Sequence, residues 1–219
     1  MIWGFFAIPL RNLKAYPSEQ ILYYRIFTSL IVIWLAILLF RRKELKNDVV
    51  YFKQSSRANK RIILQQIIGA TLLLVLNWYT FIYAINNVSI KSGAFAYMVC
   101  PLITAFGGFI ILKEHLYRIQ IMALILATVS ILMLATGSLI EVAWSVGIAA
   151  LYAFYLIIQR KMQHLDKLNV LAVQISIAVI LMMPFFVYQH TALPMEKSFW
   201  LNVVLIAVLF TVVPLLAAK

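Results

Sequence analysis

One charged side chain, Arg25, lies inside a long apolar run of the sequence. The run covers residues 18–40, and Arg25 follows about two helical turns, roughly 10 Å, after its start. A guanidinium at such a depth is costly and usually faces the interior of a helical bundle or a water-filled cavity. In that position it could bind a carboxylate or a phosphate. The alternative is a side chain that snorkels back to the lipid headgroups beside Tyr23 and Tyr24.

Amide and aromatic side chains gather in the apolar run of residues 62–85 and just after it. On a helix, Tyr79, Tyr83 and Asn86 share one stripe, which could line a pathway for organic molecules. Interfacial anchoring by Trp and Tyr is the alternative for the rings near the end of the run. An amide deep in the run, as at Asn77, requires a partner, which could be another helix or a substrate. The candidate pathway residues in this region are Asn77, Trp78, Tyr83, Asn86 and Asn87.

The next apolar run, residues 92–112, combines small side chains with Tyr97 and Pro101. Small residues let helices approach one another closely. Pro101 removes a backbone hydrogen bond from the helix interior, so we expect a kink there, and we include Tyr97 and Pro101 among the pathway candidates. Glu114 follows the run, where we expect a structural role at the helix end, paired with a nearby Lys or Arg.

The sequence contains no residue pattern that indicates catalysis or a bound metal. Its three histidines, His115, His164 and His190, fall in expected loops, and none has a second histidine or a carboxylate at ligand spacing. The motifs HExxH and GxSxG and the phosphate-binding P-loop are absent. The single Cys100 excludes an internal disulfide and a cysteine-based metal site. We therefore expect neither a cofactor nor an enzyme. An intramembrane enzyme is the alternative function, but the sequence offers no set of catalytic residues for it.

The elements that position these residues are expected to be membrane helices. Hydrophobic residues make up 64% of the chain and charged residues only 12%, against about 45–50% and about 25% in soluble domains. In lipid the apolar runs must be helical, because a strand outside a closed barrel leaves its backbone groups without partners. The sequence therefore predicts an all-α, polytopic helical bundle. Its eight apolar segments are residues 1–10, 18–40, 62–85, 92–112, 119–140, 142–158, 169–188 and 198–218.

The first of these segments is too short to span a bilayer, which requires about 20 residues, and residues 142–158 are at the short limit. Lys and Arg predict the orientation of the other segments. Fourteen of the nineteen basic residues lie in one set of alternating loops and four in the opposite set. The positive-inside rule places the first set, and with it the N-terminus, in the cytoplasm. The largest of these cytoplasmic loops, residues 41–61, is expected to be about twenty residues long.

The net charge of +12 could also suggest a nucleic-acid partner. The basic residues cluster in short loops between apolar runs, so membrane orientation is the simpler cause. We therefore expect no nucleic acid as a partner.

Three stretches of the sequence, NWYTFIYAINN, AFAYMVCPL and LKEHLYRIQIMALILATVSI, together resemble the EamA family of the drug/metabolite transporter superfamily. The stretch PSEQILYYRIFTSL looks most like the RarD-like branch of that family, the chloramphenicol-sensitivity proteins. The likeness covers most of the chain. The residues that match the family pattern are Arg25, Asn77, Trp78, Asn86, Asn87, Tyr97, Pro101 and Glu114. The departures from it, which make the substrate of a relative unsafe to transfer, include Gln20, Cys100, Lys113 and His115.

The resemblance implies a ten-helix fold built from two five-helix repeats in opposite orientations. Residues 1–140 would form the first repeat, with a shortened first helix, and residues 141–219 an incomplete second repeat, so that about eight helices are expected. The implied function is efflux of small organic metabolites or drugs by alternating access, as a permease of the cell inner membrane. The alternative is a non-transporting membrane protein or an inactive fragment of such a transporter. The expected partners are the lipid bilayer and a small-molecule substrate, and a homodimer is left open.

Overall fold

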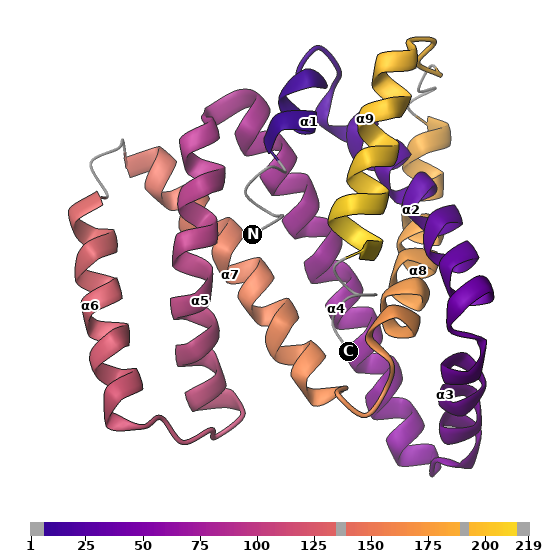
Figure 1. Ribbon diagram of the computed structural model, residues 1–219, viewed down its shortest axis with the longest axis horizontal. Helices are drawn as coiled ribbons and strands as arrows, with labels where there is room; N and C mark the ends of the chain where they lie inside the picture. The colour runs from indigo at the N-terminus through magenta and orange to yellow at the C-terminus, as the bar shows by residue number, and fades with distance from the viewer. Residues whose placement is uncertain (1–6, 135–138, 189–192, 214–219) are drawn as a thin grey trace.

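The computed structural model describes residues 7–134, 139–188 and 193–213, and every regular element in these ranges is a helix (Figure 1). Successive long helices run in opposite directions between the two ends of the bundle. Two π-helical turns, Ala84–Val88 and Val208–Val212, extend α4 and α9. The α-helices are α1 (Ala7–Asn12), α2 (Ser18–Phe40), α3 (Arg42–Gln54), α4 (Arg57–Tyr83), α5 (Ile90–Ile111), α6 (Arg118–Leu134), α7 (Leu139–Lys161), α8 (Lys167–Tyr188) and α9 (Lys197–Ala207).

Five of these helices are long and apolar enough to cross a membrane, namely α2, α4 with its π-helical turn, α5, α7 and α8. The predicted all-α, polytopic membrane bundle is therefore confirmed. The predicted apolar segments 119–140 and 198–218 are described only in part, and their apolar helices in the described residues are Arg118–Ser130 and Lys197–Val212. Residues 135–138 and 214–219, at the ends of those two predicted segments, lie outside the described residues.

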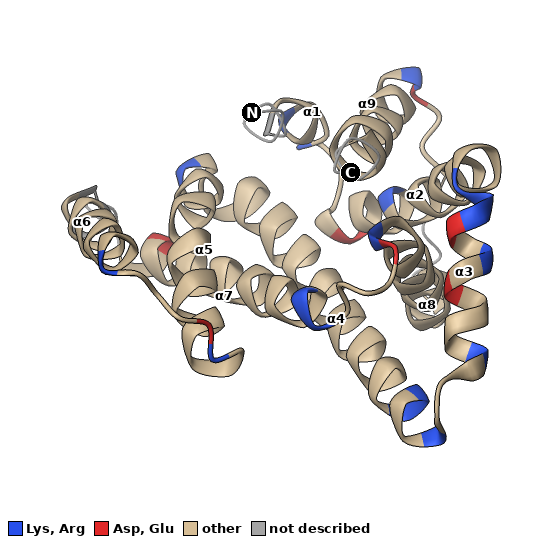
Figure 2. Ribbon diagram, turned by 60° about the horizontal axis from the view of Figure 1, so that its bottom comes forward, with Lys and Arg blue, Asp and Glu red and all other residues tan. Residues whose placement is uncertain are grey.

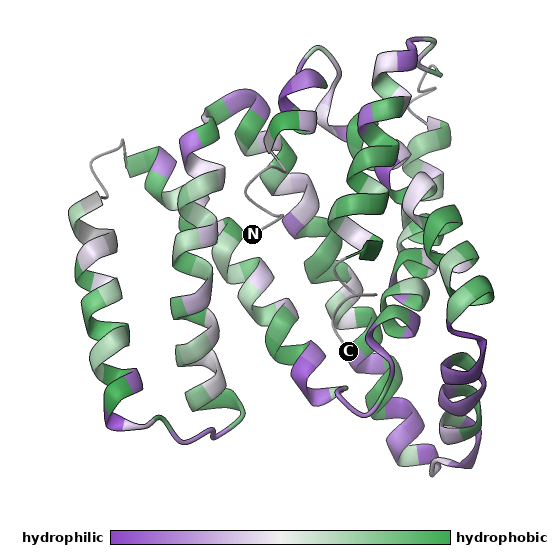
Figure 3. Cartoon of the chain, viewed as in Figure 1, coloured by the Kyte–Doolittle hydropathy of each residue, from purple (hydrophilic) through white to green (hydrophobic). Residues whose placement is uncertain are grey.

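The middle of the bundle is formed by α4 and α7. Helix α7 packs along α5 and against α4, and α4 also contacts α8 (Figure 1). On one side α2 packs against α8 and α9, and at the other edge α6 lies against α5. Hydrophobic residues predominate along the long helices, whereas hydrophilic residues gather at α3 and at the helix ends (Figure 3). Such an apolar exterior is typical of helices that are solvated by lipid.

Basic residues gather at the end of the bundle that carries α3, the start of α4 and the α5–α6 and α7–α8 connections, which we call the basic end (Figure 2). The prediction of a long loop over residues 41–61 is wrong, because most of this stretch is α3 and α4 already begins at Arg57. Its residues have ordinary helix propensity. Ser56 caps α4, since its hydroxyl accepts a hydrogen bond of 3.3 Å from the backbone N–H of Asn59. Helix α3 is polar and has no buried residue, so its sequence contains no apolar run that would predict it.

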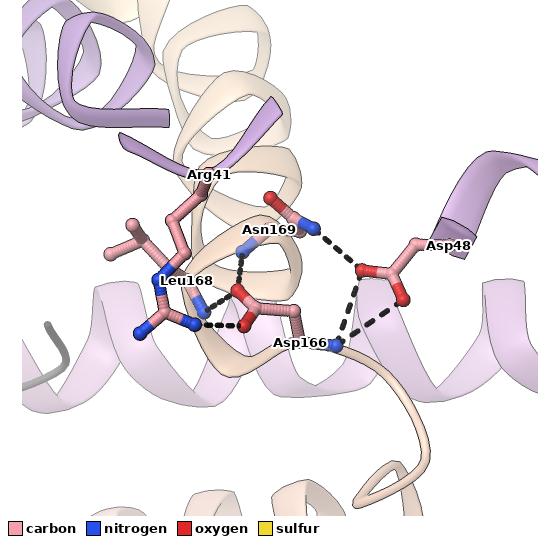
Figure 4. Close-up of polar contacts among 5 residues, drawn as sticks. All are labelled: Arg41, Asp48, Asp166, Leu168 and Asn169. Atoms are coloured by element: carbon pink, nitrogen blue, oxygen red, sulfur yellow. Dashed lines mark hydrogen bonds and ion pairs between the residues drawn. The ribbon is translucent and has the colours of Figure 1, made fainter. Parts of the chain in front are cut away.

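Two carboxylates join three elements at the basic end (Figure 4). Asp166 accepts a charge-assisted hydrogen bond of 2.7 Å from Arg41, at the end of α2. Its other oxygen caps α8 by accepting hydrogen bonds from the backbone N–H groups of Leu168 and Asn169, at 3.0 and 3.2 Å. Asp48 of α3 accepts from the backbone N–H of Asp166 at 3.2 Å and from the side chain of Asn169 at 2.6 Å. The cluster therefore positions α3 against the ends of α2 and α8.

Small residues set the separation of α5 and α7. A Cβ atom built on Gly107 of α5 would collide with the side chain of Ile157 on α7. A Cβ atom on Gly108 would lie 2.8 Å from an oxygen of Glu114, which is also too close. Gly147 of α7 is different, because a Cβ atom there meets nothing within 4 Å. A side chain at Gly107 would therefore have to displace Ile157 at the contact of α5 with α7, whereas one at Gly147 would meet open space.

We expect the substitution Gly107→Leu to lower the free energy of unfolding by about 1–3 kcal/mol, the typical cost of overpacking. The matched variant Gly147→Leu places the same side chain in open space on α7 and should leave stability unchanged. Thermal unfolding of the two purified proteins in detergent, followed by circular dichroism, measures the difference. Equal midpoints would contradict the close crossing at Gly107.

Candidate functional site

A cavity of about 670 Å³ lies between the helices of the bundle. Its wall is formed by α2, α4, α5, α7, α8 and the π-helical turn Val208–Val212. It extends from side chains at the α7–α8 connection, on the basic end, to Arg25 and Phe81 deeper in the bundle. Pockets of about 300–1,000 Å³ are typical of small-molecule sites in proteins.

Arg25 is the charged group of the deep half of this cavity. It belongs to α2 and is only 1% exposed. Its guanidinium carbon lies 3.8 Å from the centroid of the Trp78 ring of α4, in a cation–π contact. The structure thus directs the side chain to the bundle interior, rather than along the helix towards the headgroups.

Aromatic side chains form much of the remaining wall. Phe81 and Tyr97 meet edge to face with ring centroids 5.3 Å apart, and they join α4 to α5. On α7, the rings of Tyr152 and Tyr155 are stacked with centroids 5.8 Å apart. Such rings offer flat apolar surface together with hydroxyl groups, which suits an aromatic or amphipathic ligand.

A buried polar network supports the α7 side of the cavity. Gln159 donates one hydrogen bond of 2.7 Å to the hydroxyl of Tyr155 and another of 3.2 Å to the side-chain oxygen of Gln174 on α8. Gln174 is 0% exposed, and its nitrogen has no hydrogen-bond partner among the described residues. The network holds the ring of Tyr155 against the wall and joins α7 to α8.

At the basic end, the mouth of the cavity carries Arg160, Gln163 and Lys167. Arg160 donates to both carboxylate oxygens of Glu114, at 2.7 and 2.9 Å. Both side chains of this pair are about half exposed, at 50% and 44%, so the pair contributes little to stability. Glu114 lies in the α5–α6 connection, and the bond therefore joins this connection to the end of α7.

Four of the predicted pathway residues line the cavity, namely Arg25, Asn77, Trp78 and Tyr97. For Asn77, we expected either another helix or a substrate as the partner. Its side chain lines the cavity and also donates a hydrogen bond of 3.0 Å to the backbone carbonyl of Ile148 on α7. Pro101 is exposed on the outside of α5, which continues as one helix from Ile90 to Ile111.

The other three predicted residues, Tyr83, Asn86 and Asn87, lie at the opposite end of the bundle and are not among the cavity's lining residues. Asn87 makes a local contact, since its side-chain amide donates a hydrogen bond of 3.1 Å to the backbone carbonyl of Tyr83. The ring of Tyr83 stacks on that of Trp144 of α7 with centroids 5.2 Å apart. Asn86 donates to the hydroxyl of Ser18 at 3.3 Å, joining α4 to α2.

A fourth contact at this opposite end joins the same two helices. The hydroxyl of Tyr79 on α4 donates a hydrogen bond of 2.9 Å to the carboxylate of Glu19 on α2. The contacts of Tyr79, Tyr83 and Asn86 thus connect α2, α4 and α7 at the end far from the cavity mouth. The side chains of the predicted stripe, Tyr79, Tyr83 and Asn86, therefore contact neighbouring helices.

Sequence reasoning missed the contribution of α7 to the cavity. Tyr152, Tyr155 and Gln159 follow one another at intervals of three and four residues, so they share one face of a helix. This spacing could have identified them. Cys100 and Thr104 also line the cavity, at the same interval on α5. Cys100 is the chain's single cysteine and is buried.

Comparison with known proteins identifies the family. The model of the EamA-like transporter family matches residues 1–136. The protein RarD of Escherichia coli K12 is 28% identical over 162 residues, which cover 73% of this chain and 51% of RarD. RarD of Streptomyces exfoliatus is 27% identical over 176 residues, covering 80% of this chain and 53% of that protein.

A third relative, the uncharacterised transporter YojE of Bacillus subtilis, is 26% identical over 135 residues, covering 62% of this chain and 44% of YojE. The chain spans about half the length of the curated relatives it matches. No solved structure matches the chain. Since the family model covers well over half of its residues, this multi-pass membrane protein belongs to the EamA-like transporter family.

Proposed function

We propose that the protein transports small organic molecules across the cell inner membrane and that the cavity is its binding site. The observation that carries this proposal is a cavity of about 670 Å³ with aromatic walls and a buried arginine, between helices that can span a membrane. The relatives that are named as transporters support it.

We further propose that transport proceeds by alternating access, in the direction of efflux. The positive-inside rule favours a cytoplasmic basic end. The cavity mouth at Arg160 and Lys167 would then admit substrate from the cytoplasm. Release on the other side would require the contacts of Tyr79, Tyr83 and Asn86 to open. The two repeats, residues 1–140 and 141–219, would rock against each other, and α2 would also separate from α4 within the first repeat, because two of these contacts lie inside it.

The substitution Arg25→Ala should reduce transport at least tenfold while leaving membrane insertion unchanged, because it removes the charged group of the cavity's deep half. The substrate is first identified by comparing the metabolites released by cells with and without the gene. Efflux of that compound is then measured for the wild type, for Arg25→Ala and for Arg61→Ala, an exposed arginine of α4 that serves as the matched control.

Normal efflux by Arg25→Ala, at a membrane level equal to that of the wild type, would remove Arg25 from the binding site. If no compound differs between the two strains, transport itself is refuted as the function.

The substitution Tyr79→Phe should open the end of the bundle opposite to the mouth, because it removes the hydroxyl that binds Glu19. A hydrogen bond to a charged group contributes about 1.5–3 kcal/mol, so we expect the outward-open population to rise about tenfold or more. Labelling of Cys100 by a membrane-impermeant thiol reagent, in right-side-out and inside-out vesicles, measures access from each side.

The wild-type thiol should react faster in inside-out vesicles, and Tyr79→Phe should raise the rate in right-side-out vesicles. Tyr83→Phe is the matched control, since it keeps the ring that stacks on Trp144 and removes a hydroxyl that makes no hydrogen bond to the described residues. An unchanged rate in Tyr79→Phe would show that the bond to Glu19 does not hold this end closed.

A further inference from the structure

We infer that the cavity selects organic anions, in which a carboxylate or another anionic group is carried on an aromatic or apolar body. This inference rests on the proposed function, because it names the class of substrate for the same cavity. It is drawn from the charges that line the cavity, from the donors that are already engaged there, and from the shape of its aromatic wall.

The cavity is lined by cations and by no carboxylate. Arg25, Arg160 and Lys167 belong to its wall. All seven acidic residues of the chain lie in the described ranges, and none of them is a lining residue. Between membrane helices the dielectric constant is low, so an imbalance of fixed charge acts more strongly than it would in water. A positive cavity of this kind concentrates anions and repels cations.

The neutral polar groups of the deep half are largely committed to the protein. Thr104 donates its hydroxyl to the backbone carbonyl of Cys100 at 2.8 Å, and Thr211 donates to that of Ile206 at 3.3 Å. The amide of Asn77 donates to the carbonyl of Ile148. These side chains shape the cavity, and Arg25 is the charged residue of its deep wall.

The contact of Arg25 with Trp78 suits it to an anion. The ring lies against the guanidinium at 3.8 Å, in a cation–π contact. The N–H donors of a guanidinium lie in its plane and point outward from its edges, so stacking on a face does not use them. A planar carboxylate can accept two such donors at once, which gives both strength and orientation.

The mouth is less positive than its cations alone suggest. Glu114 binds Arg160 through both oxygens, so it neutralises one of the two basic groups there. Lys167 then attracts an anion to the mouth, and the buried guanidinium of Arg25 holds it more strongly in the deep half. The aromatic rings of Phe81, Tyr97 and Tyr152 also line the cavity and would contact the apolar body.

A cationic substrate is the main competitor, because aromatic rings also bind cations. Such a ligand would have to lie among these rings in the presence of Arg25, without a carboxylate in the wall to compensate. The charge of the ligand therefore discriminates between the two classes, and an experiment can vary charge at constant shape.

The single cysteine of the chain reports the charge of the cavity directly, since Cys100 is a lining residue. The purified protein is treated with the anionic sulfonatoethyl and the cationic trimethylammonioethyl methanethiosulfonate. Each rate is divided by the rate of the same reagent with 2-mercaptoethanol. We expect the normalised rate to be at least about tenfold higher for the anionic reagent at low salt, and the ratio to fall as salt screens the charges.

Variants locate the source of the preference. Arg25→Gln should bring the ratio to within about twofold of one, whereas Arg25→Lys, which keeps a positive charge, and Arg61→Gln, at an exposed site, should preserve it. If Arg25→Gln does not fold, the wild-type ratio and its preservation in Arg25→Lys still decide the matter. A wild-type ratio near one, or one that favours the cationic reagent, would overturn the inference.

A second experiment uses three ligands of one shape, 3-phenylpropanoate, 3-phenylpropanamide and 3-phenylpropylamine. Each is tested for protection of Cys100 against the neutral methyl methanethiosulfonate. The carboxylate should protect at a concentration at least about tenfold lower than the amide, and the amine should protect least. Equal protection by the amide, stronger protection by the amine, or no protection by any of the three would overturn the anion preference.

These outcomes are independent of the test of transport. If efflux depends on Arg25 but the identified substrate is neutral or cationic, the proposed function stands and the anion preference falls. If cells with and without the gene release the same compounds while Cys100 still prefers anionic reagents, transport falls and the charge selectivity of the cavity stands.

Discussion

A guanidinium held among apolar helices is the constraint around which this bundle is arranged. On insertion scales an arginine at the centre of a membrane helix costs about 2.5–3.5 kcal/mol. Its contact with a tryptophan ring returns about 0.5–2 kcal/mol. Arg25 meets this cost by facing inward, where Trp78 covers one face of it and the cavity wall provides a polar side. The contact of Arg25 with Trp78 places the Arg25 face of α2 against α4.

The two ends of the bundle are built in different ways. At the end far from the mouth, neutral and acidic side chains bind across helices, as Tyr79 does with Glu19 and Asn86 with Ser18. At the basic end, the polar contacts lie beside the cavity, with Asp166 binding Arg41 and Glu114 binding Arg160. The polar groups thus join helices at one end of the bundle and lie beside the cavity at the other.

Part of the fold and of the site could be predicted from the sequence. The bounds of α2, Ser18–Phe40, agree with the predicted apolar run, because a charge or a turn residue limits it on each side. Arg25, Trp78 and Tyr97 were predicted and do line the cavity. Polar side chains in an apolar run are rare, because burying them in a membrane costs free energy, and they can therefore be identified from the sequence.

Other features could not be read in this way. Helix α3 was taken for a loop, since its residues form no apolar run although they form a helix. The contribution of α7 was not predicted, because the helix face that Tyr152 and Tyr155 share could equally meet a neighbouring helix. Pro101 was expected in the pathway, but it lies on the exposed side of α5. Helical spacing identifies which residues share a face and does not indicate what that face meets.

The sequence by itself determined that the chain is a helical membrane protein, that most of its basic residues belong at one end, and that Arg25 requires an unusual environment. These properties follow from hydropathy and charge, which act residue by residue. Only the tertiary structure decided that Tyr79 and Asn86 bind neighbouring helices while Tyr97 and Tyr155 line a cavity. The physical reason is that a polar group in a membrane bundle takes whichever partner packing brings within reach, and packing joins residues far apart in the chain.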